Sequence, residues 1–238
     1  MKIACFGDSL TRGTPGCSYF ALLQGHLPGD TLLNYGRGND TVASLYRRIS
    51  AGRFEQPLHI AILWIGVNDV LQTDGRPQRV FNTLIGQPRA RDTEEFRAYY
   101  QATLELLCAQ ASRVIVASPA LKGEVLDNPW NRRLTELALV IQELTAGYAQ
   151  AEYLELRPLF VQVLENKPIS NYLLTSPFRI LWDMLMLRSA DQVDARARER
   201  GLHLTLDGVH LNSAGARLVA GELSAAIQSR PPATSQAG

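Results

Sequence analysis

The chain has 238 residues, 46% of them hydrophobic, which is enough to bury the core of one large domain. Its 24 Lys and Arg residues nearly cancel its 23 Asp and Glu residues, so the formal net charge is +1. This balance gives no electrostatic reason to expect nucleic acid or an anionic membrane as the main partner. The three cysteines are sparse and lack metal-ligand spacing, which suits a reducing compartment.

The first residues already have the pattern of a strand, without the charged region and apolar stretch that are typical of a secretory signal. No run approaches the roughly 20 apolar residues that a membrane-spanning helix needs. These features predict a cytoplasmic protein without stable membrane insertion.

Short apolar runs alternate along the chain with longer segments of helical period. Strands are predicted at residues 2–6, 31–34, 59–65, 113–117 and 152–156. Several of these runs are continuous rather than alternating, as is typical of strands covered on both faces. Helical stripes follow at 96–107, 130–148 and 218–227, the last with Asn212 or Ser213 as N-cap. The alternation predicts a parallel sheet with helices on both faces.

Two stretches interrupt this rhythm. Residues 72–93 are rich in Arg, Gly, Pro and Gln and are predicted to form a long loop. Residues 157–206 form a longer insert, apolar nearly all round in its first part and densely charged at its end. Loops of this length in a compact domain are usually functional or mobile. Residues 231–238 have the composition of a disordered tail.

Four polar motifs are expected to meet at one edge of the predicted sheet, because ligands of such sheets bind beyond the carboxyl ends of the strands. Three of them follow the first three strands, and the fourth precedes the C-terminal helix. They are Gly-Asp-Ser-Leu at 7–10, the polar loop at 34–41, Gly-Val-Asn-Asp at 66–69 and Asp-Gly-Val-His at 207–210.

These motifs contain the groups that acyl transfer needs. Ser9, on the turn after the first strand, is a candidate nucleophile, and His210 is the base that would remove its proton. Asp207, three residues earlier, would orient the imidazole. The amide of Asn68, with backbone N–H groups of Ser9 and of the loop after the second strand, would stabilise the oxyanion.

The chain resembles the GDSL, or SGNH, hydrolase superfamily over nearly its whole length, with these four motifs in the family's order. The resemblance implies a single domain over residues 1–230 with a flavodoxin-like three-layer α/β/α sandwich around a parallel sheet of about five strands. It also implies ester or thioester hydrolysis without metal or cofactor, and a triad of Ser9, Asp207 and His210. Ser9 and Asn68 would both be oxyanion donors.

The second motif departs from the family's usual Asn-x-Gly-x-x-Gly-Asp-Thr. Asn39 stands at the second glycine, and Gly38 lies one place earlier. A backbone N–H is available from either residue, and Asn tolerates left-handed conformations better than most residue types. We therefore expect the oxyanion donor to be kept, from Gly38 or Asn39.

Substrate contacts are less constrained by the sequence. Arg37 is a candidate to contact a polar or anionic substrate. The alternative is that it is a loop arginine exposed to solvent. Phe178 and Trp182, in the apolar part of the insert, are candidate pocket residues. Three interpretations of this part are open: a helix packed on the core, a wall or lid over the acyl pocket, or a dimer or membrane-surface contact.

The sequence thus predicts a serine esterase acting on a small-molecule ester. An acyl or acetyl transferase, or a carbohydrate acetylesterase, on the same machinery is the alternative. A non-catalytic binding module is less favoured because all three triad residues are present. A homo-oligomer is left open.

Overall fold

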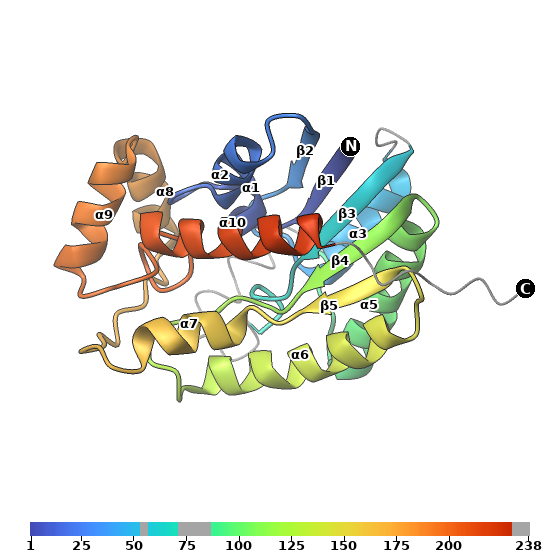
Figure 1. Cartoon of the computed structure of the whole chain (residues 1–238). Helices are drawn as coiled ribbons and strands as arrows, with labels where there is room; N and C mark the ends of the chain where they lie inside the picture. Colours follow the sequence, from blue (N-terminus) through green and yellow to red (C-terminus); the bar gives the residue numbers. More distant parts are fainter. Residues whose placement is uncertain (53–56, 71–86, 230–238) are drawn as a thin grey trace, which may run out of the picture.

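The computed structural model describes residues 1–52, 57–70 and 87–229. Its centre is an all-parallel five-stranded sheet with the strand order β2-β1-β3-β4-β5 (Figure 1). The strands are β1 (Lys2–Gly7), β2 (Thr31–Gly36), β3 (Leu58–Trp64), β4 (Ala111–Ala117) and β5 (Ala151–Leu154). The predicted strands are confirmed, with bounds shifted by one or two residues.

The strand order places a topological switch point between β1 and β3, because the chain leaves β1 for β2 on one side and then crosses to β3 on the other. At such a point the connecting loops separate and leave a crevice at the carboxyl ends of the strands. The register pairs Gly7 with Gly36 across β1 and β2, so these two strands end level with each other.

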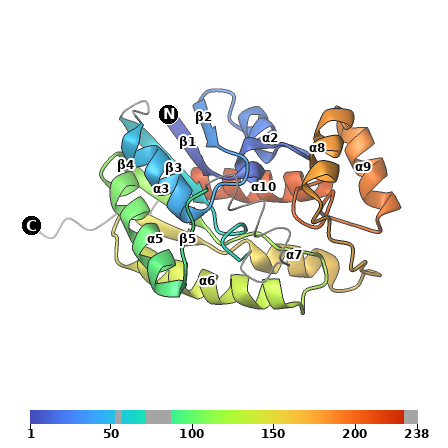
Figure 2. The same ribbon diagram turned by 180° about the vertical axis from the view of Figure 1, so that it is seen from behind.

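Helices cover both faces of the sheet, and the two opposite views agree on the layers (Figures 1 and 2). One face carries α2 and α10, and the other carries α3, α5 and α6. Their bounds are α2 (Tyr19–His26), α3 (Val42–Ala51), α5 (Thr93–Cys108), α6 (Pro129–Ala146) and α10 (Ser213–Gln228). The predicted three-layer α/β/α architecture is confirmed.

The apolar stripes of the long helices are the faces that pack on the sheet. In α5 the stripe of Phe96, Tyr100, Leu104 and Leu107 is buried. The start of α10 is fixed by Asn212, whose Oδ1 accepts hydrogen bonds at 3.0 Å from two backbone N–H groups of the first turn.

Residues 157–206, the predicted insert, are largely helical. They contain three helices, α7 (Arg157–Leu164), α8 (Pro177–Met186) and α9 (Ala190–Glu199). A helix apolar nearly all round is expected to be buried, yet Asp183 is the one buried residue of α8. The interpretation of this segment as a helix packed on the core is therefore wrong. In both views α8 and α9 lie together at one end of the molecule.

The predicted loop at 72–93 falls largely outside the described residues, which omit 71–86. Its last part, residues 87–92, has no helix or strand, and α5 begins at Thr93. The predicted tail at 231–238 also lies outside the described residues. Among those that are described, no helix is both long enough and apolar enough to cross a membrane.

A close approach of backbones at the end of β2 predicts the effect of one substitution. A Cβ on Gly36 would lie 2.2 Å from Arg12 N and 2.6 Å from Thr11 C. We expect Gly36→Ala to lower the free energy of unfolding by about 1–3 kcal/mol through overpacking, measured by urea denaturation. Gly25→Ala is the matched control: apart from the adjoining backbone of its own helix, nothing lies within 4 Å of its Cβ, and a helical alanine should add roughly 0.5–1 kcal/mol. Equal stabilities for the two variants would contradict this packing.

Candidate active site

Ser9 is the first residue of a short helix, α1 (Ser9–Arg12), that begins directly after β1. Asp8 is the N-cap of this helix and is 1% exposed; its Oδ1 accepts a hydrogen bond from Leu10 N at 2.9 Å. The N–H of a first helical residue has no acceptor within its own helix. Ser9 therefore presents both its hydroxyl and a backbone donor at the crevice.

The local sequence around Ser9 is dictated by tight packing. A Cβ on Gly7 would lie 2.3 Å from both Thr11 Oγ1 and Trp64 O, so only glycine lets α1 turn back over the strand ends. The side chain of Asn34 then links β2 to this helix, because its Nδ2 donates to Thr11 O at 2.8 Å while its Oδ1 accepts from Gly36 N at 2.8 Å. The first two polar motifs thus hold each other in place.

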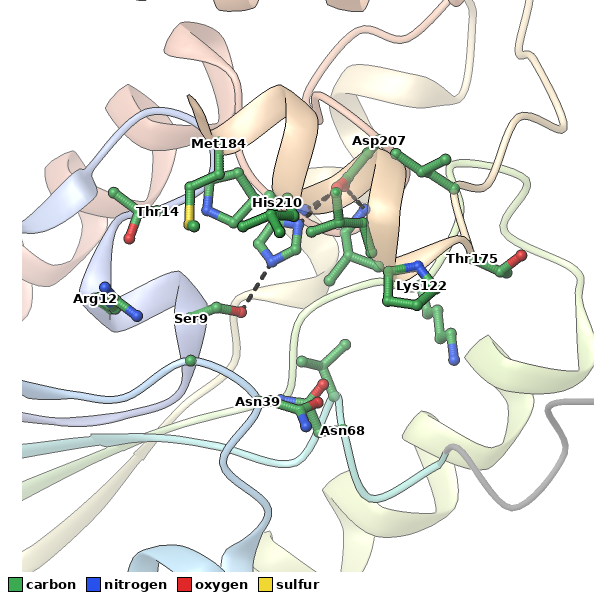
Figure 3. Close-up of a pocket in the computed structure, with 18 residues that line it drawn as sticks. Ser9, Arg12, Thr14, Asn39, Asn68, Lys122, Thr175, Met184, Asp207 and His210 are labelled. Atoms are coloured by element: carbon green, nitrogen blue, oxygen red, sulfur yellow. Dashed lines mark hydrogen bonds and ion pairs between the residues drawn. The ribbon is translucent and has the colours of Figure 1, made fainter. Parts of the chain in front are cut away.

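Ser9, His210 and Asp207 form one continuous hydrogen-bonded chain (Figure 3). His210 Nε2 lies 2.9 Å from Ser9 Oγ, and His210 Nδ1 lies 2.7 Å from Asp207 Oδ2. The other oxygen, Asp207 Oδ1, accepts from the backbone N–H groups of Val209 and His210 at 3.0 and 2.8 Å. With Nδ1 protonated toward the carboxylate, Nε2 is left to accept the serine proton.

A buried carboxylate that the sequence reasoning missed holds the segment before Asp207. Glu124, with no exposed area, accepts four hydrogen bonds, each 2.8 Å long, from the backbone N–H groups of residues 203–205 and from Thr205 Oγ1. Thr205 Oγ1 in turn accepts from Gly208 N at 3.2 Å. Glu124 follows β4, at the same sheet edge as the polar motifs. Its position after a predicted strand was the signal in the sequence that could have marked it as a site residue.

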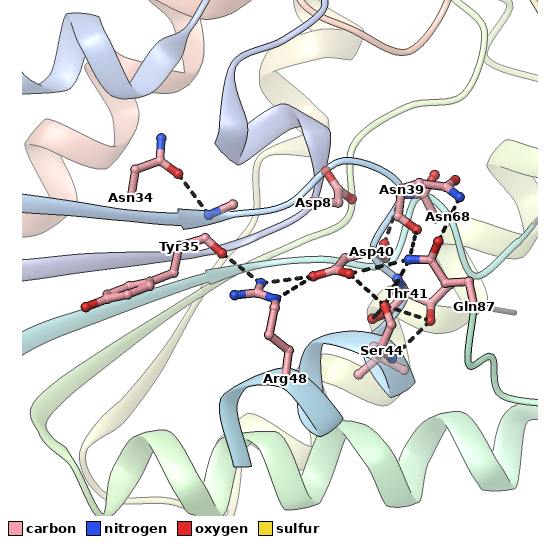
Figure 4. A network of polar contacts seen from close by, with 12 residues as sticks. Asp8, Asn34, Tyr35, Asn39, Asp40, Thr41, Ser44, Arg48, Asn68 and Gln87 are labelled. Atoms are coloured by element: carbon pink, nitrogen blue, oxygen red, sulfur yellow. Dashed lines mark hydrogen bonds and ion pairs between the residues drawn. The ribbon is translucent and has the colours of Figure 1, made fainter. Parts of the chain in front are cut away.

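The opposite wall of the crevice is a polar network around Asp40 (Figure 4). Asp40 is buried and pairs with Arg48 at 2.9 Å, and its Oδ1 accepts from Ser44 Oγ at 2.9 Å. Its backbone oxygen accepts from Asn68 Nδ2 at 2.9 Å. An amide nitrogen carries two hydrogens, so Asn68 keeps a second N–H for another acceptor.

Asn39 adopts the left-handed conformation expected of it, with φ of 66°. A second residue that the sequence reasoning missed, Gln87, binds it twice: Asn39 Nδ2 donates to Gln87 Oε1 at 2.9 Å, and Gln87 Nε2 donates to Asn39 O at 2.6 Å. Gln87 lies in a segment whose composition indicated only a loop, so the sequence held no signal for it. The clamp fixes the backbone where an oxyanion donor is expected.

A cavity of about 380 Å³ opens at Ser9 and His210. Its walls include Gly38, Asn39 and Asn68, so the structure brings the predicted oxyanion residues together with the predicted triad. The far wall is apolar and comes mainly from α8 and the segment before it. The apolar lining residues are Pro15, Val67, Leu174, Pro177, Ile180, Leu181, Met184 and Val209.

Three predicted substrate residues do not line this cavity. Arg37 is exposed on the loop after β2, where its backbone N–H donates to Gly7 O at 3.1 Å. Phe178 and Trp182 are 81% and 61% exposed, because they lie on the side of α8 that faces away from the cavity. The inward side of the same helix supplies Ile180 and Met184 instead.

Polar lining residues were also missed. Arg12, three residues after Ser9, lies one helical turn further on, and this spacing was a usable signal. Lys122 lines the cavity as well, although it is 4% exposed and its Nζ lies 5.4 Å from the centre of the Trp130 ring. Within the described residues, no group of three or more His, Cys, Asp or Glu is placed to hold a metal ion.

The buried charges of the site shift one another's pKa values. Burial alone would lower the pKa of His210, but the charge of Asp207, their hydrogen bond and the charge of Asp8 together raise it above its ordinary 6.5. Burial would raise the pKa of Asp207, yet His210 and the backbone donors hold it below 3.8. Burial raises the pKa of Asp8 to about 7, against the opposing effects of Leu10 N–H and His210.

The fold is of the α/β class, and comparison with known proteins identifies the family. The family model described as the GDSL-like lipase/acylhydrolase family matches residues 5–218. The chain therefore belongs to this family and is an ester-hydrolysing enzyme. Among curated proteins, none matches the chain.

Several solved structures are similar. Axe2, an acetylxylan esterase from Geobacillus stearothermophilus, aligns with a TM-score of 0.67 at 18% identity, over 96% of this chain and 94% of its own. The acetyl xylan esterase AlAXEase aligns with a TM-score of 0.64 at 21% identity, over 95% of this chain and 100% of its own. LAE5, an α/β hydrolase from the metagenome of Lake Arreo, Spain, aligns with a TM-score of 0.66 at 18% identity, over 94% of each chain. At these identities the likeness shows the shared fold.

The electrostatics of the site predict how His210 titrates. Its folded pKa is raised, so the ring should lose its proton above pH 6.5. Asp207→Asn and Asp8→Asn should each lower that pKa, because each removes a negative charge that favours the imidazolium. The Asp8 effect should be the smaller, since a pKa of about 7 leaves this carboxyl partly protonated in the same range.

NMR titration of the histidine rings measures this directly, with His26, His59 and His203 as internal references. Asparagine keeps the oxygen that caps α1 at position 8, so the fold is expected to persist. A His210 pKa that is unchanged in both variants would mean that neither charge reaches the ring.

Proposed function

We propose that the chain hydrolyses carboxylic esters by covalent catalysis, with Ser9 as nucleophile, His210 as general base and Asp207 as the group that orients it. The observation that carries this proposal is the hydrogen-bonded chain of the three side chains at the mouth of the 380 Å³ cavity. Nucleophile, base and orienting carboxylate lie within the distances that such chemistry uses.

The reaction has two halves. His210 Nε2 takes the proton from Ser9 Oγ as this oxygen attacks the ester carbonyl, and a C–O bond forms while the carbonyl electrons move onto its oxygen. The intermediate collapses, His210 returns the proton to the departing alcohol, and an acyl-Ser9 ester is left. Water, deprotonated by His210, then releases the carboxylic acid by the same two steps.

In this proposal three donors stabilise the oxyanion. They are the N–H of Ser9 at the start of α1, the N–H of Gly38 or Asn39 in the clamped loop, and the second N–H of Asn68. Asn68 is held by Asp40 O and the loop by Gln87, so these donors are fixed before the substrate arrives. Preorganised donors stabilise the transition state because no reorganisation is needed at the moment of reaction.

We infer an ester with an apolar acyl group as the substrate, because α8 lines the cavity with Ile180, Leu181 and Met184. A second candidate is an acetylated sugar, which the likeness to acetylxylan esterases favours. The cavity also has polar lining at Arg12, Asn39 and Lys122 that a carbohydrate would use. An acyl transferase differs only in the acceptor that attacks acyl-Ser9, and product analysis with added alcohols distinguishes it.

Loss of the nucleophile or of one oxyanion donor should reduce hydrolysis without loss of the fold. We expect Ser9→Ala to abolish hydrolysis of p-nitrophenyl acetate, and Asn68→Ala to lower kcat by about 100- to 1000-fold. Asn166→Ala, which removes an exposed asparagine amide, is the matched control. Turnover by Ser9→Ala close to that of the wild type would rule out the proposed mechanism.

The size of the cavity should determine the acyl preference. Met184 points into the cavity beside His210 (Figure 3), so Met184→Trp would fill space that a longer acyl chain needs. Relative to acetate, kcat/KM for the hexanoate ester should fall about tenfold or more, while Leu139→Trp, at an exposed position of α6, should not change the ratio.

The same enzymes assayed on acetylated xylo-oligosaccharides test the second candidate. Faster turnover of these sugars than of any p-nitrophenyl ester, with no effect of Met184→Trp on the chain-length ratio, would favour a sugar acetate over an apolar acyl group.

A further inference from the structure

Helix α8 exposes an apolar surface that neither the core nor the ester cavity accounts for. Among the described residues eight large hydrophobic side chains are exposed, and five of them lie on this ten-residue helix. These five, which we term the α8 apolar face, are Phe178, Leu181, Trp182, Leu185 and Met186, with exposed fractions from 48% to 81%. A concentration of this kind is typical of an interaction site.

The spacing of these residues explains the exposure. Phe178, Leu181, Trp182 and Leu185 stand at i, i+3, i+4 and i+7, which places them along one stripe of the helix. The opposite stripe carries Ile180 and Met184, which face the cavity. Leu181 belongs to both surfaces, since it is 48% exposed and also lines the cavity. The apolar face is therefore continuous with the wall of the ester site.

The exposed charges of α8 and of the two residues after it have one sign. Arg179 and Arg188 are exposed at the two ends of the face. The one acidic residue of α8, whose residues are all described, is Asp183; it is 5% exposed and lies 2.7 Å from Arg200. The apolar face is thus bordered by arginines without an exposed carboxylate of its own helix.

A second cavity, of about 330 Å³, adjoins the face. Arg179, Arg196 and Arg200 line it, and we call these three the arginine cradle; Tyr172 and Trp182 provide aromatic walls. Arg200 is held by Asp183 and by the Tyr172 ring, 5.1 Å from its guanidinium. Arg196 also pairs with Glu199 at 3.2 Å. The three guanidinium groups and these two carboxylates leave the cradle with one net positive charge, which suits a phosphate-bearing headgroup.

We propose that α8 docks on an anionic lipid surface, with the apolar face entering the headgroup–acyl boundary and the arginines binding headgroup phosphates. A helix with Trp, Phe and Leu along its exposed stripe and arginines at the border of that stripe has the composition of an interfacial helix. The net charge of +1 does not oppose this proposal, because the local charge governs the contact. Docking brings the mouth of the ester cavity to the lipid surface.

The charges favour a lipid surface over a second copy of the chain. In a two-fold contact the same patch meets itself, so the arginines that border the face would approach the arginines of the partner copy. Like charges at an interface cost free energy unless acidic groups separate them. α8 has no exposed acid, and of the two exposed acids on α9, Asp191 and Glu199, the second already pairs with Arg196. Anionic headgroups complement the same arginines.

Binding of the full chain to vesicles tests this proposal. We expect co-sedimentation with vesicles of equimolar phosphatidylcholine and phosphatidylglycerol, and much weaker binding to phosphatidylcholine alone or at high salt. The binding assay does not require catalysis, so Ser9→Ala should bind as the wild type does. A failure of the proposed esterase mechanism would therefore leave this result unaffected.

Trp182 provides a spectroscopic reporter of the contact. It is 61% exposed, whereas Trp64 is 2% exposed and Trp130 is half-buried, so its emission should move to shorter wavelength when anionic vesicles are added. Trp182→Phe should lose most of that shift and still co-sediment, because phenylalanine keeps an aromatic ring on the face.

Double variants separate the apolar and the electrostatic contributions to vesicle binding. Phe178→Ser with Leu185→Ser should weaken vesicle binding about tenfold or more. Arg179→Glu with Arg188→Glu should weaken binding to anionic vesicles by roughly thirtyfold. The matched controls are Leu139→Ser, which removes a side chain 62% exposed on α6, and Arg47→Glu, which reverses an exposed charge on α3.

Two outcomes would overturn the proposal. One is vesicle binding that the α8 variants reduce no more than the controls do, with the folded state of each variant verified by thermal denaturation. The other is a dimer in sedimentation analysis that Phe178→Ser with Leu185→Ser dissociates, because the occupant of the face would then be a second copy.

Discussion

The hydrogen bond between Ser9 and His210 joins residues 201 positions apart, and the rest of the site depends on holding its two ends still. Ser9 is fixed by α1, which the close packing at Gly7 and Gly36 presses against the strand ends. His210 sits on a loop without regular structure, so its position rests on individual contacts. Glu124 binds the residues before it, Asp207 binds the ring, and Asn212 starts α10 directly after it. The need to hold Ser9 and His210 in place explains why buried polar groups gather at this edge of the sheet.

The sequence determined those parts of the fold that local patterns encode. Continuous apolar runs gave the strands to within one or two residues, and the stripe from Phe96 to Leu107 gave the buried face of α5. The order of the polar motifs placed Ser9, Asn68 and His210 at one edge, because carboxyl ends of parallel strands meet there. Asn212 was predictable as a cap because capping depends on neighbours in sequence.

Contacts between distant segments were not encoded in this way. Gln87 clamps Asn39 across 48 positions, and Glu124 holds Thr205 across 81. No spacing rule links such pairs, so only the folded chain reveals them. The side of α8 that faces the cavity was equally unreadable, because apolar residues occupy two opposite sides of this helix and do not show which side is covered. That is why Phe178 and Trp182 were assigned to the cavity that Ile180 and Met184 line.

The exposed side of α8 raises the question of what stabilises this helix. A helix that buries one side chain contributes little to the core, and its stability must come from neighbours such as the buried pair of Asp183 and Arg200. Five exposed large apolar residues do not reduce the free energy of the isolated chain, because they remain in contact with water. Folding alone therefore does not account for them. The lipid surface that we propose would remove them from water, and the position of Leu181 on both surfaces puts that surface next to the ester site.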